Sequence, residues 1–163
     1  MTHSSSSIKE MPVNPPLFNL WMTDLGDILA LAERSPVQSQ YPLAVFRVRI
    51  FPSLWNGQYL LLRKQGKACA FVNWAWLSDS LSEHYQKTQC YIEPQLWCSG
   101  NNLWFMEIMG AEYLQDLVHQ LRNVIPAGTL AKWHEVHMVG SLSASCRLVK
   151  FHGADFANAT HDE

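Results

Sequence analysis

The sequence has little net charge and no long hydrophobic run. Its 163 residues carry 12 lysines and arginines against 14 aspartates and glutamates, which gives a formal net charge of −2. A chain so close to neutrality does not favour general binding to nucleic acid or other polyanions. No apolar run approaches the roughly 18 residues of a membrane-spanning helix. The polar start of the chain also lacks the apolar segment of a secretory signal. We therefore expect a cytoplasmic protein without a membrane span and without a nucleic-acid partner.

Motifs for nucleotide and metal chemistry are also missing. The chain contains no GxGxxG, phosphate-loop or GxSxG pattern, so nothing indicates nucleotide binding or a serine hydrolase. His134 and His137 lie on a predicted strand, where a spacing of three residues directs side chains to opposite faces and prevents joint chelation. We therefore expect neither a metal nor a bound cofactor. No close CxxC spacing occurs among the four cysteines, which we expect to be free thiols in a reducing compartment. They are Cys69, Cys90, Cys98 and Cys146.

The pattern of apolar residues predicts one α+β domain over residues 14–153, with flexible tails at 1–13 and 154–163. Spacings of three and four residues predict helices over Leu17–Glu33 and Ala111–Val124, and Ser78-Asp79-Ser80 is a typical cap for a helix over Leu81–Lys87. Alternating or continuous apolar runs predict the strands. These are Leu43–Phe51, Tyr59–Arg63, Ala68–Leu77, Leu103–Met109, Leu130–Met138 and Ser145–Phe151. The order favours one mixed or antiparallel sheet with helices on its faces.

Glu107 is the most informative single residue, because it is a carboxylate within the apolar run Leu103–Met109. On a regular strand it shares a face with Leu103, Phe105 and Met109. A buried carboxylate is costly unless it is paired or hydrogen-bonded. Two explanations stay open. Glu107 either reaches solvent or a buried arginine, or it is a desolvated acid/base group with a raised pKa.

The basic residues fall into two small groups. Arg47 and Arg49 share one face of the strand predicted over Leu43–Phe51, while Lys64 and Lys67 flank a predicted hairpin turn. Either these groups belong to an ordinary solvated face of the sheet, or they form a docking patch for an acidic partner or a phosphate-bearing carrier.

Several segments, taken in order, resemble the RTX toxin-activating lysine acyltransferases, the family of the hemolysin-activating acyltransferases. The resemblance covers roughly residues 18–153. It lies in Ser35-Pro36 with Tyr41-Pro42, in Phe51-Pro52 leading to Gly57-Gln58-Tyr59-Leu60-Leu61-Leu62, in Ala70-Phe71-Val72-Asn73-Trp74-Ala75-Trp76-Leu77-Ser78, in Trp97-x-Ser99-Gly100-Asn101-x-x-Trp104-Phe105, and in Phe151-His152-Gly153.

This resemblance implies a GNAT-like fold, a homodimer, and an enzyme that moves a fatty acyl chain from acyl carrier protein to a lysine of a protoxin. At three positions this sequence departs from the family pattern. Gln38 stands where the family has a catalytic histidine, Glu107 where it has a catalytic aspartate, and Arg49 where it has an asparagine, while Ser35 is kept. Glutamine does not titrate near neutral pH, so Gln38 cannot act as a general base.

We therefore expect a lysine acyltransferase with an altered active site. Glu107 would deprotonate or orient the acceptor amine, and Gln38 and Ser35 would hydrogen-bond the thioester carbonyl or the tetrahedral intermediate. The donor would be acyl carrier protein, docked on the basic groups containing Arg47 and Lys64. Two alternatives remain: a relative that binds the carrier or a partner without transfer, and a transferase that acts on a small peptide or amine.

Overall fold

Five strands form one mixed sheet in the computed structural model, which describes residues 15–135 and 145–150. The strands lie side by side in chain order as β1 (Tyr59–Lys64), β2 (Lys67–Leu77), β3 (Asn102–Met109), β4 (Leu130–Glu135) and β5 (Ser145–Lys150). Neighbouring strands are antiparallel except β3 and β4, which are parallel. The predicted α+β class is confirmed, and the arrangement is consistent with a GNAT-like fold.

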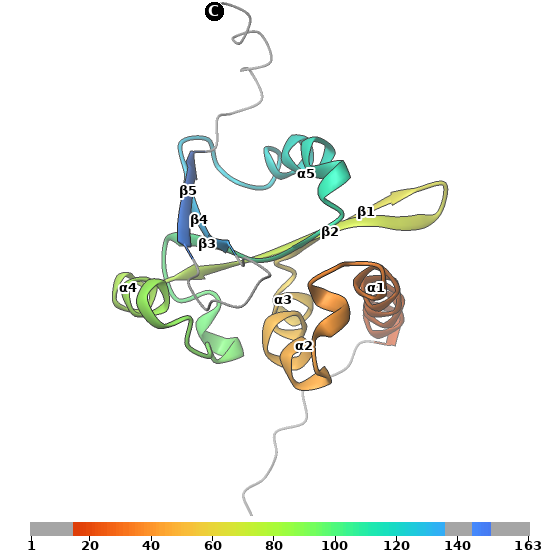
Figure 1. Ribbon diagram of the computed structural model, residues 1–163, viewed down its shortest axis with the longest axis horizontal. Coiled ribbons are helices and arrows are strands. Elements are labelled where there is room, and N and C mark those ends of the chain that lie inside the picture. Colours follow the sequence, from red (N-terminus) through yellow and green to blue (C-terminus); the bar gives the residue numbers. More distant parts are fainter. Residues whose placement is uncertain (1–14, 136–144, 151–163) are drawn as a thin grey trace, which may run out of the picture.

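Helices cover both faces of this sheet (Figure 1). The helices before β3 lie on one face: α1 (Pro15–Glu33), α2 (Leu43–Arg49), α3 (Phe51–Asn56) and α4 (Asp79–Thr88). The opposite face is covered by α5 (Leu114–Leu121), which follows a single 3-10 turn, η3 (Ala111–Tyr113). Successive residues of β2 alternate between these layers, since Val72 packs in the core under α5 and Phe71 in the core under α1. The sheet therefore has two buried faces.

The strand predicted over Leu43–Phe51 is wrong, because this segment forms α2 and the start of α3. Phe46 and Ile50 are both buried, and a spacing of four residues places them on one side of a helix as readily as on one face of a strand. The aromatic and β-branched residues favoured the strand interpretation, but packing against α1 and β2 selects the helix. Arg47 and Arg49 consequently lie in the last turn of α2, where cations complement the helix dipole.

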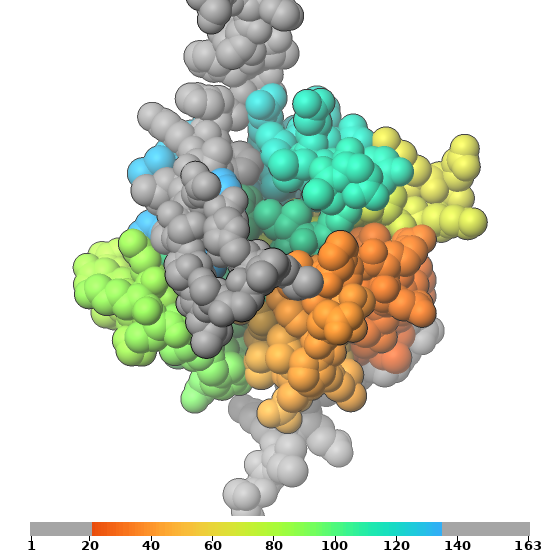
Figure 2. Space-filling model, viewed as in Figure 1, coloured from red at the N-terminus to blue at the C-terminus, as the bar shows by residue number. Residues whose placement is uncertain are grey.

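The remaining predicted elements are present with shifted ends. The Ser78 hydroxyl caps α4 by accepting from the Leu81 backbone N–H at 3.4 Å. The helix expected over Ala111–Val124 is split between η3 and the shorter α5. The hairpin between β1 and β2 turns through Gln65 and Gly66, whose φ angles of 53° and 75° fit a two-residue hairpin turn. This hairpin projects beyond the helices on the right of Figures 1 and 2.

Some expectations concern residues that the structure does not describe. The tails predicted at 1–13 and 154–163 lie outside the described residues, as do His137 and the last residues of the strand predicted over Leu130–Met138. Within the described ranges, no helix combines the length and the apolar character needed to cross a bilayer.

Candidate active site

A one-residue bulge in β3 sets the position of Glu107. Asn73 of β2 pairs with Glu107, but the next β2 residue, Trp74, pairs with Phe105, so Met106 has no opposite residue. A bulge interrupts the alternation of side chains and places two consecutive residues on one side. As a result, Met106 and Glu107 both face the layer of α1–α4.

The predicted neighbours of Glu107 are therefore only partly correct. Leu103 and Phe105 pack in the core under α5, on the opposite face from Glu107. Met109, which follows the bulge at an interval of two, packs in the core beneath α1 and shares the face of Glu107. The bulge turns the carboxylate away from a purely apolar layer and towards polar side chains of the N-terminal helical region.

Asn73 satisfies the backbone that the bulge disturbs. Its buried Oδ1 accepts from the Glu107 N–H at 2.8 Å, and its Nδ2 donates to the Arg49 carbonyl at 2.8 Å and to the Ser53 hydroxyl at 3.0 Å. One fully buried amide thus joins β3, the end of α2 and the start of α3. These hydrogen bonds fix the position of the Glu107 backbone relative to α2 and α3.

Gln38 and Ser35 reach Glu107 from the chain that follows α1. Gln38 begins the short 3-10 helix η1 (Gln38–Gln40), and its Nε2 donates to Glu107 Oε2 at 2.8 Å. Ser35 donates from its hydroxyl to Gln38 Oε1. The structure therefore brings Ser35, Gln38 and Glu107, the three residues proposed from the sequence, into one hydrogen-bonded chain.

Tyr41 completes this side of the carboxylate. Its hydroxyl lies 3.2 Å and 3.3 Å from the two Glu107 oxygens and donates to them. Burial, together with the negative charge of Glu107, raises the pKa of Tyr41 to about 12. Tyr41 is thus neutral at physiological pH and serves Glu107 as a donor.

Arg49 pairs with Glu107 from the other side. Its Nε contacts Glu107 Oε1 in an ion pair, and its Nη2 donates to the Met106 carbonyl at 2.7 Å. Burial disfavours the charged guanidinium, but the neighbouring carboxylate more than offsets this, so the pKa of Arg49 is raised. Of the two explanations left open for Glu107, pairing with an arginine is confirmed, and that arginine is partly rather than fully buried.

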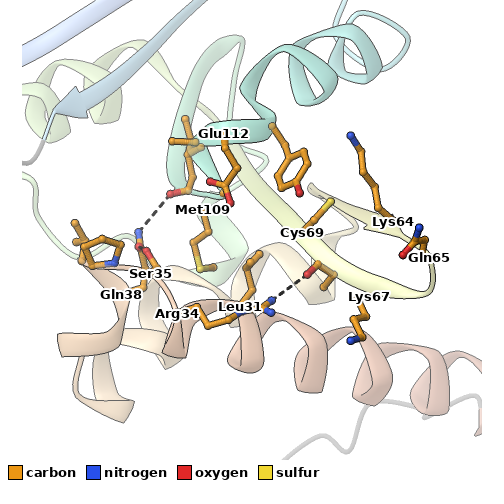
Figure 3. Close-up of a pocket in the computed structure, with 17 residues that line it drawn as sticks. Leu31, Arg34, Ser35, Gln38, Lys64, Gln65, Lys67, Cys69, Met109 and Glu112 are labelled. Atoms are coloured by element: carbon orange, nitrogen blue, oxygen red, sulfur yellow. Dashed lines mark hydrogen bonds between the residues drawn. The ribbon is translucent and has the colours of Figure 1, made fainter.

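A cavity of about 720 Å³ opens beside Ser35 and Gln38, between the end of α1, the β1–β2 hairpin and η3 (Figure 3). This volume lies within the roughly 300–1,000 Å³ typical of small-molecule pockets. Much of the wall is apolar: Leu31, Pro36, Val37, Ile108, Met109 and Ala111. Gly110 lies in the same wall with φ of 78°, and a Cβ at this position would press into the Cys69 carbonyl oxygen. A side chain at Gly110 would therefore push β3 away from β2.

Three basic side chains lie around this cavity: Arg34, Lys64 and Lys67. Arg34 Nη2 donates to the Ala68 carbonyl at 3.0 Å. Lys64 pairs with Asp116 of α5 at 2.8 Å, an exposed contact of small energetic value. Among the described side chains, Lys67 has no ion-pair partner, so its charge faces solvent.

The carrier-docking group predicted from the sequence is therefore rearranged. Arg47 is exposed on α2, while Arg49 is committed to Glu107 and does not share a basic face with Arg47. Lys64 and Lys67 flank the mouth of the cavity, as Figure 3 shows. Arg49 therefore contacts the hydrogen-bonded chain of Ser35, Gln38 and Glu107 through Glu107, and it does not belong to the group of exposed cations.

His134 lies on β4, as predicted, on the same sheet face as Trp104. Its ring stacks on Trp104 at a centroid distance of 4.9 Å, and its Nε2 lies 3.2 Å from the Gln86 carbonyl. A carbonyl only accepts, so we assign the ring hydrogen to Nε2. Burial lowers the pKa of His134, and the positive charge of Arg49 lowers it further. This histidine is therefore a neutral packing residue near Arg49.

Tyr41 and Asn73 are the site residues that sequence reasoning missed. Asn73 carried a usable signal, because it is a polar residue in the middle of the apolar run Ala68–Leu77. Tyr41 lay within one of the quoted motifs, but nothing in its spacing pointed to Glu107. Both become visible only when β2, β3 and η1 are placed together.

Comparison with known proteins identifies relatives for most of this chain. The sequence model of the RTX toxin acyltransferase family matches residues 21–146. The RTX-I toxin-activating lysine-acyltransferase ApxIC of Actinobacillus pleuropneumoniae is 29% identical over 83 residues, which cover 51% of this chain and 48% of the relative. The lysine-acyltransferase RtxC of Vibrio cholerae is 27% identical over 117 residues, covering 68% and 76%.

A third relative shows the same partial coverage. The protein-lysine myristoyltransferase RtxC of Kingella kingae is 28% identical over 109 residues, covering 65% of this chain and 64% of the relative. The chain thus spans between about half and three quarters of the length of these relatives.

Proposed function

This chain belongs to the RTX toxin acyltransferase family, and from that premise we propose that it is a protein-lysine N-acyltransferase. It would transfer a fatty acyl group from acyl carrier protein to a lysine of a toxin or another polypeptide. The name of one relative describes a toxin-activating lysine-acyltransferase and that of another a lysine-acyltransferase, which supports this acceptor class. The observation that carries the proposal is the hydrogen-bonded chain of Ser35, Gln38 and Glu107, whose first two residues line a partly apolar cavity.

The cavity is the proposed place for the acyl thioester. The apolar part of its wall suits an acyl chain, and Ser35 and Gln38 line the same cavity, where they would meet the thioester carbonyl. The carrier is acidic, so the exposed cations Lys64, Lys67 and Arg47 would attract it. We include no bound cofactor in this proposal, because the acyl donor arrives on its carrier.

In the proposed reaction the acceptor amine forms a C–N bond to the thioester carbonyl, and the C–S bond then breaks. Glu107 orients the acceptor and takes the first of the two protons that the ammonium group loses. As the amide forms, one of these protons ends on the carrier thiol and the other passes to solvent. Gln38 Nε2 uses one hydrogen on Glu107, while its distance of 3.5 Å to the Ile108 carbonyl is too long for a strong second bond. The second hydrogen can therefore serve the developing oxyanion, and the Ser35 hydroxyl can join it only by giving up its bond to Gln38 Oε1.

A second candidate is a relative that binds the carrier or a partner without transfer. Two observations favour it: Gln38 cannot titrate, and Glu107 is engaged by Arg49. A third candidate keeps the transfer step but uses a small peptide or amine as acceptor. The same assay separates all three.

The test is intact-mass analysis of acyl carrier protein mixed with this protein, with and without a lysine-bearing polypeptide or a small amine. Carrier deacylation with a matching mass gain on the acceptor supports a transferase, and the acceptor that gains mass defines its class. We expect Glu107→Gln to abolish transfer, while Gln40→His, on the exposed side of the same short helix, retains the parental rate. A carrier that forms a complex but stays acylated with every acceptor contradicts the transferase.

Gln38→His sharpens the choice between transfer and binding alone. If this substitution creates activity in an inert parent, the protein is a non-catalytic relative whose missing base has been restored. If the parent already turns over and Glu107→Gln matches its rate, the role assigned to Glu107 is wrong.

A further inference from the structure

Two oxygens on β3 hold a cation in the free protein. Glu107 Oε1 and the Met106 carbonyl accept from Nε and Nη2 of Arg49. The Glu107 side chain exposes only 4% of its surface, whereas the Arg49 side chain exposes 23%. The bulge creates this pair of acceptors, because it directs Glu107 to the face where the polar helical side chains lie. Arg49 is therefore the more exposed member of this ion pair.

The carboxylate does not depend on Arg49 for its position. Gln38 holds Oε2 at 2.8 Å, Tyr41 donates to both oxygens, and Asn73 holds the Glu107 N–H at 2.8 Å. These donors come from η1, its neighbouring residue and β2. If the guanidinium moves away, the two oxygens remain arranged for another cation.

The local charge also favours a cation. Tyr41 and Tyr85 face the site from the segment after η1 and from α4, and burial raises the pKa of each, so both are neutral. His134 faces it from β4 and is neutral because burial lowers its pKa. Without Arg49 the site would present one unneutralised carboxylate with few competing charges.

We infer that Glu107 Oε1 and the Met106 carbonyl form a subsite for the primary ammonium group of the acceptor, and that Arg49 occupies this subsite in the free protein. A primary ammonium has three donors on a compact centre and satisfies both oxygens. The acceptor would thus enter from the Arg49 side of Glu107, while the acyl cavity lies on the side of Gln38. Arg49 competes with the acceptor and stays paired with Glu107 until an acceptor ammonium displaces it. This inference rests on the proposed function for its biological meaning, but its central claim is ammonium binding.

Arg49→Gln tests that claim, with n-butylammonium as the probe. We expect the unfolding midpoint of this variant to rise with n-butylammonium concentration, because a ligand that binds the folded state stabilises it. Tetramethylammonium, which carries the same charge but donates no hydrogen bond, should raise it much less. The parent and Arg47→Gln, which loses the same charge from the same helix, should show no selective rise. Equal effects of both cations on Arg49→Gln would overturn the subsite.

A variant that fails to fold still gives an answer. If Arg49→Gln is unfolded on its own, n-butylammonium should restore the circular-dichroism spectrum of the folded protein. Arg49→Lys, which carries its own primary ammonium, is the control. If Arg49→Lys folds normally but n-butylammonium does not restore Arg49→Gln, the inference is contradicted. If the parent transfers acyl groups, Arg49→Gln should show at least about a tenfold lower KM for the acceptor, because the competing cation is gone. An active parent with an unresponsive Arg49→Gln refutes only the subsite. Selective ammonium binding without any acyl transfer refutes only the proposed function.

Discussion

The substitution Asn73→Ala should remove the support beneath the candidate site. The Asn73 side chain is fully buried and makes three hydrogen bonds, at 2.8 Å to the Glu107 N–H, 2.8 Å to the Arg49 carbonyl and 3.0 Å to the Ser53 hydroxyl. Alanine supplies none of them. Because the bulge leaves the Glu107 N–H dependent on Asn73, this donor loses its partner when the amide is removed.

The magnitude follows from the number of bonds. Each buried hydrogen bond contributes about 1 kcal/mol net, so the three together give a loss of about 3 kcal/mol. The vacated volume adds to this loss if the surrounding side chains do not collapse. For a domain stabilised by roughly 5–15 kcal/mol, such a loss lowers the folded-to-unfolded ratio by about a hundredfold.

Urea unfolding of both proteins measures this difference. Asn102→Ala is a matched control, since Asn102 sits at the other end of β3 and donates to the Leu77 carbonyl at 3.0 Å and to Asp79 at 2.8 Å in more exposed surroundings. We expect it to lose only about 1 kcal/mol. If Asn73→Ala loses no more than Asn102→Ala, with unchanged denaturant slopes, the reasoning about the bulge is refuted.

Two further predictions concern pH and backbone strain. The pKa of His134 is lowered in the folded state, so its contribution to stability is complete above its unfolded pKa of about 6.5 and is lost as the pH falls through the folded value. Unfolding measured between pH 8 and 5 should therefore show a shallower acid-side decline for His134→Gln than for the parent, and identical pH slopes would contradict this. Gly110→Ala should destabilise the protein by more than Gly57→Ala in thermal unfolding, because both glycines have positive φ but only Gly110 faces the Cys69 carbonyl without space for a Cβ. Equal losses for the two glycine variants would show that the close approach of β3 to β2 does not matter.

Local patterns along the chain were sufficient for most of the fold. The helix over Leu17–Glu33 was recognisable from apolar spacing, and the hairpin around Gln65-Gly66 from two apolar runs separated by turn residues. These features depend on contacts between near neighbours in the chain. Family motifs likewise singled out Ser35, Gln38 and Glu107, which the structure brings into one chain of hydrogen bonds.

The local pattern did not determine the secondary structure where the spacing of apolar residues fits both a helix and a strand. Phe46 and Ile50 satisfy both a strand face and a helix face, so the segment over Leu43–Phe51 was misassigned. The error displaced Arg49 in the prediction, because a strand would have pointed it to the same side as Arg47. Packing of α2 against the core under α1 resolves the ambiguity, and that core is assembled from distant segments.

The sequence by itself determined an α+β chain with a carboxylate in an apolar strand, a nearby serine and glutamine, and the motifs of one acyltransferase family. Only the tertiary structure decided which face Glu107 occupies and which cation it meets. A bulge is defined by two strands in register, so β3 alone cannot reveal it. The pairing of Glu107 with Arg49 joins residues 58 positions apart, and it exists because burial of a carboxylate is tolerated only where folding brings it a partner.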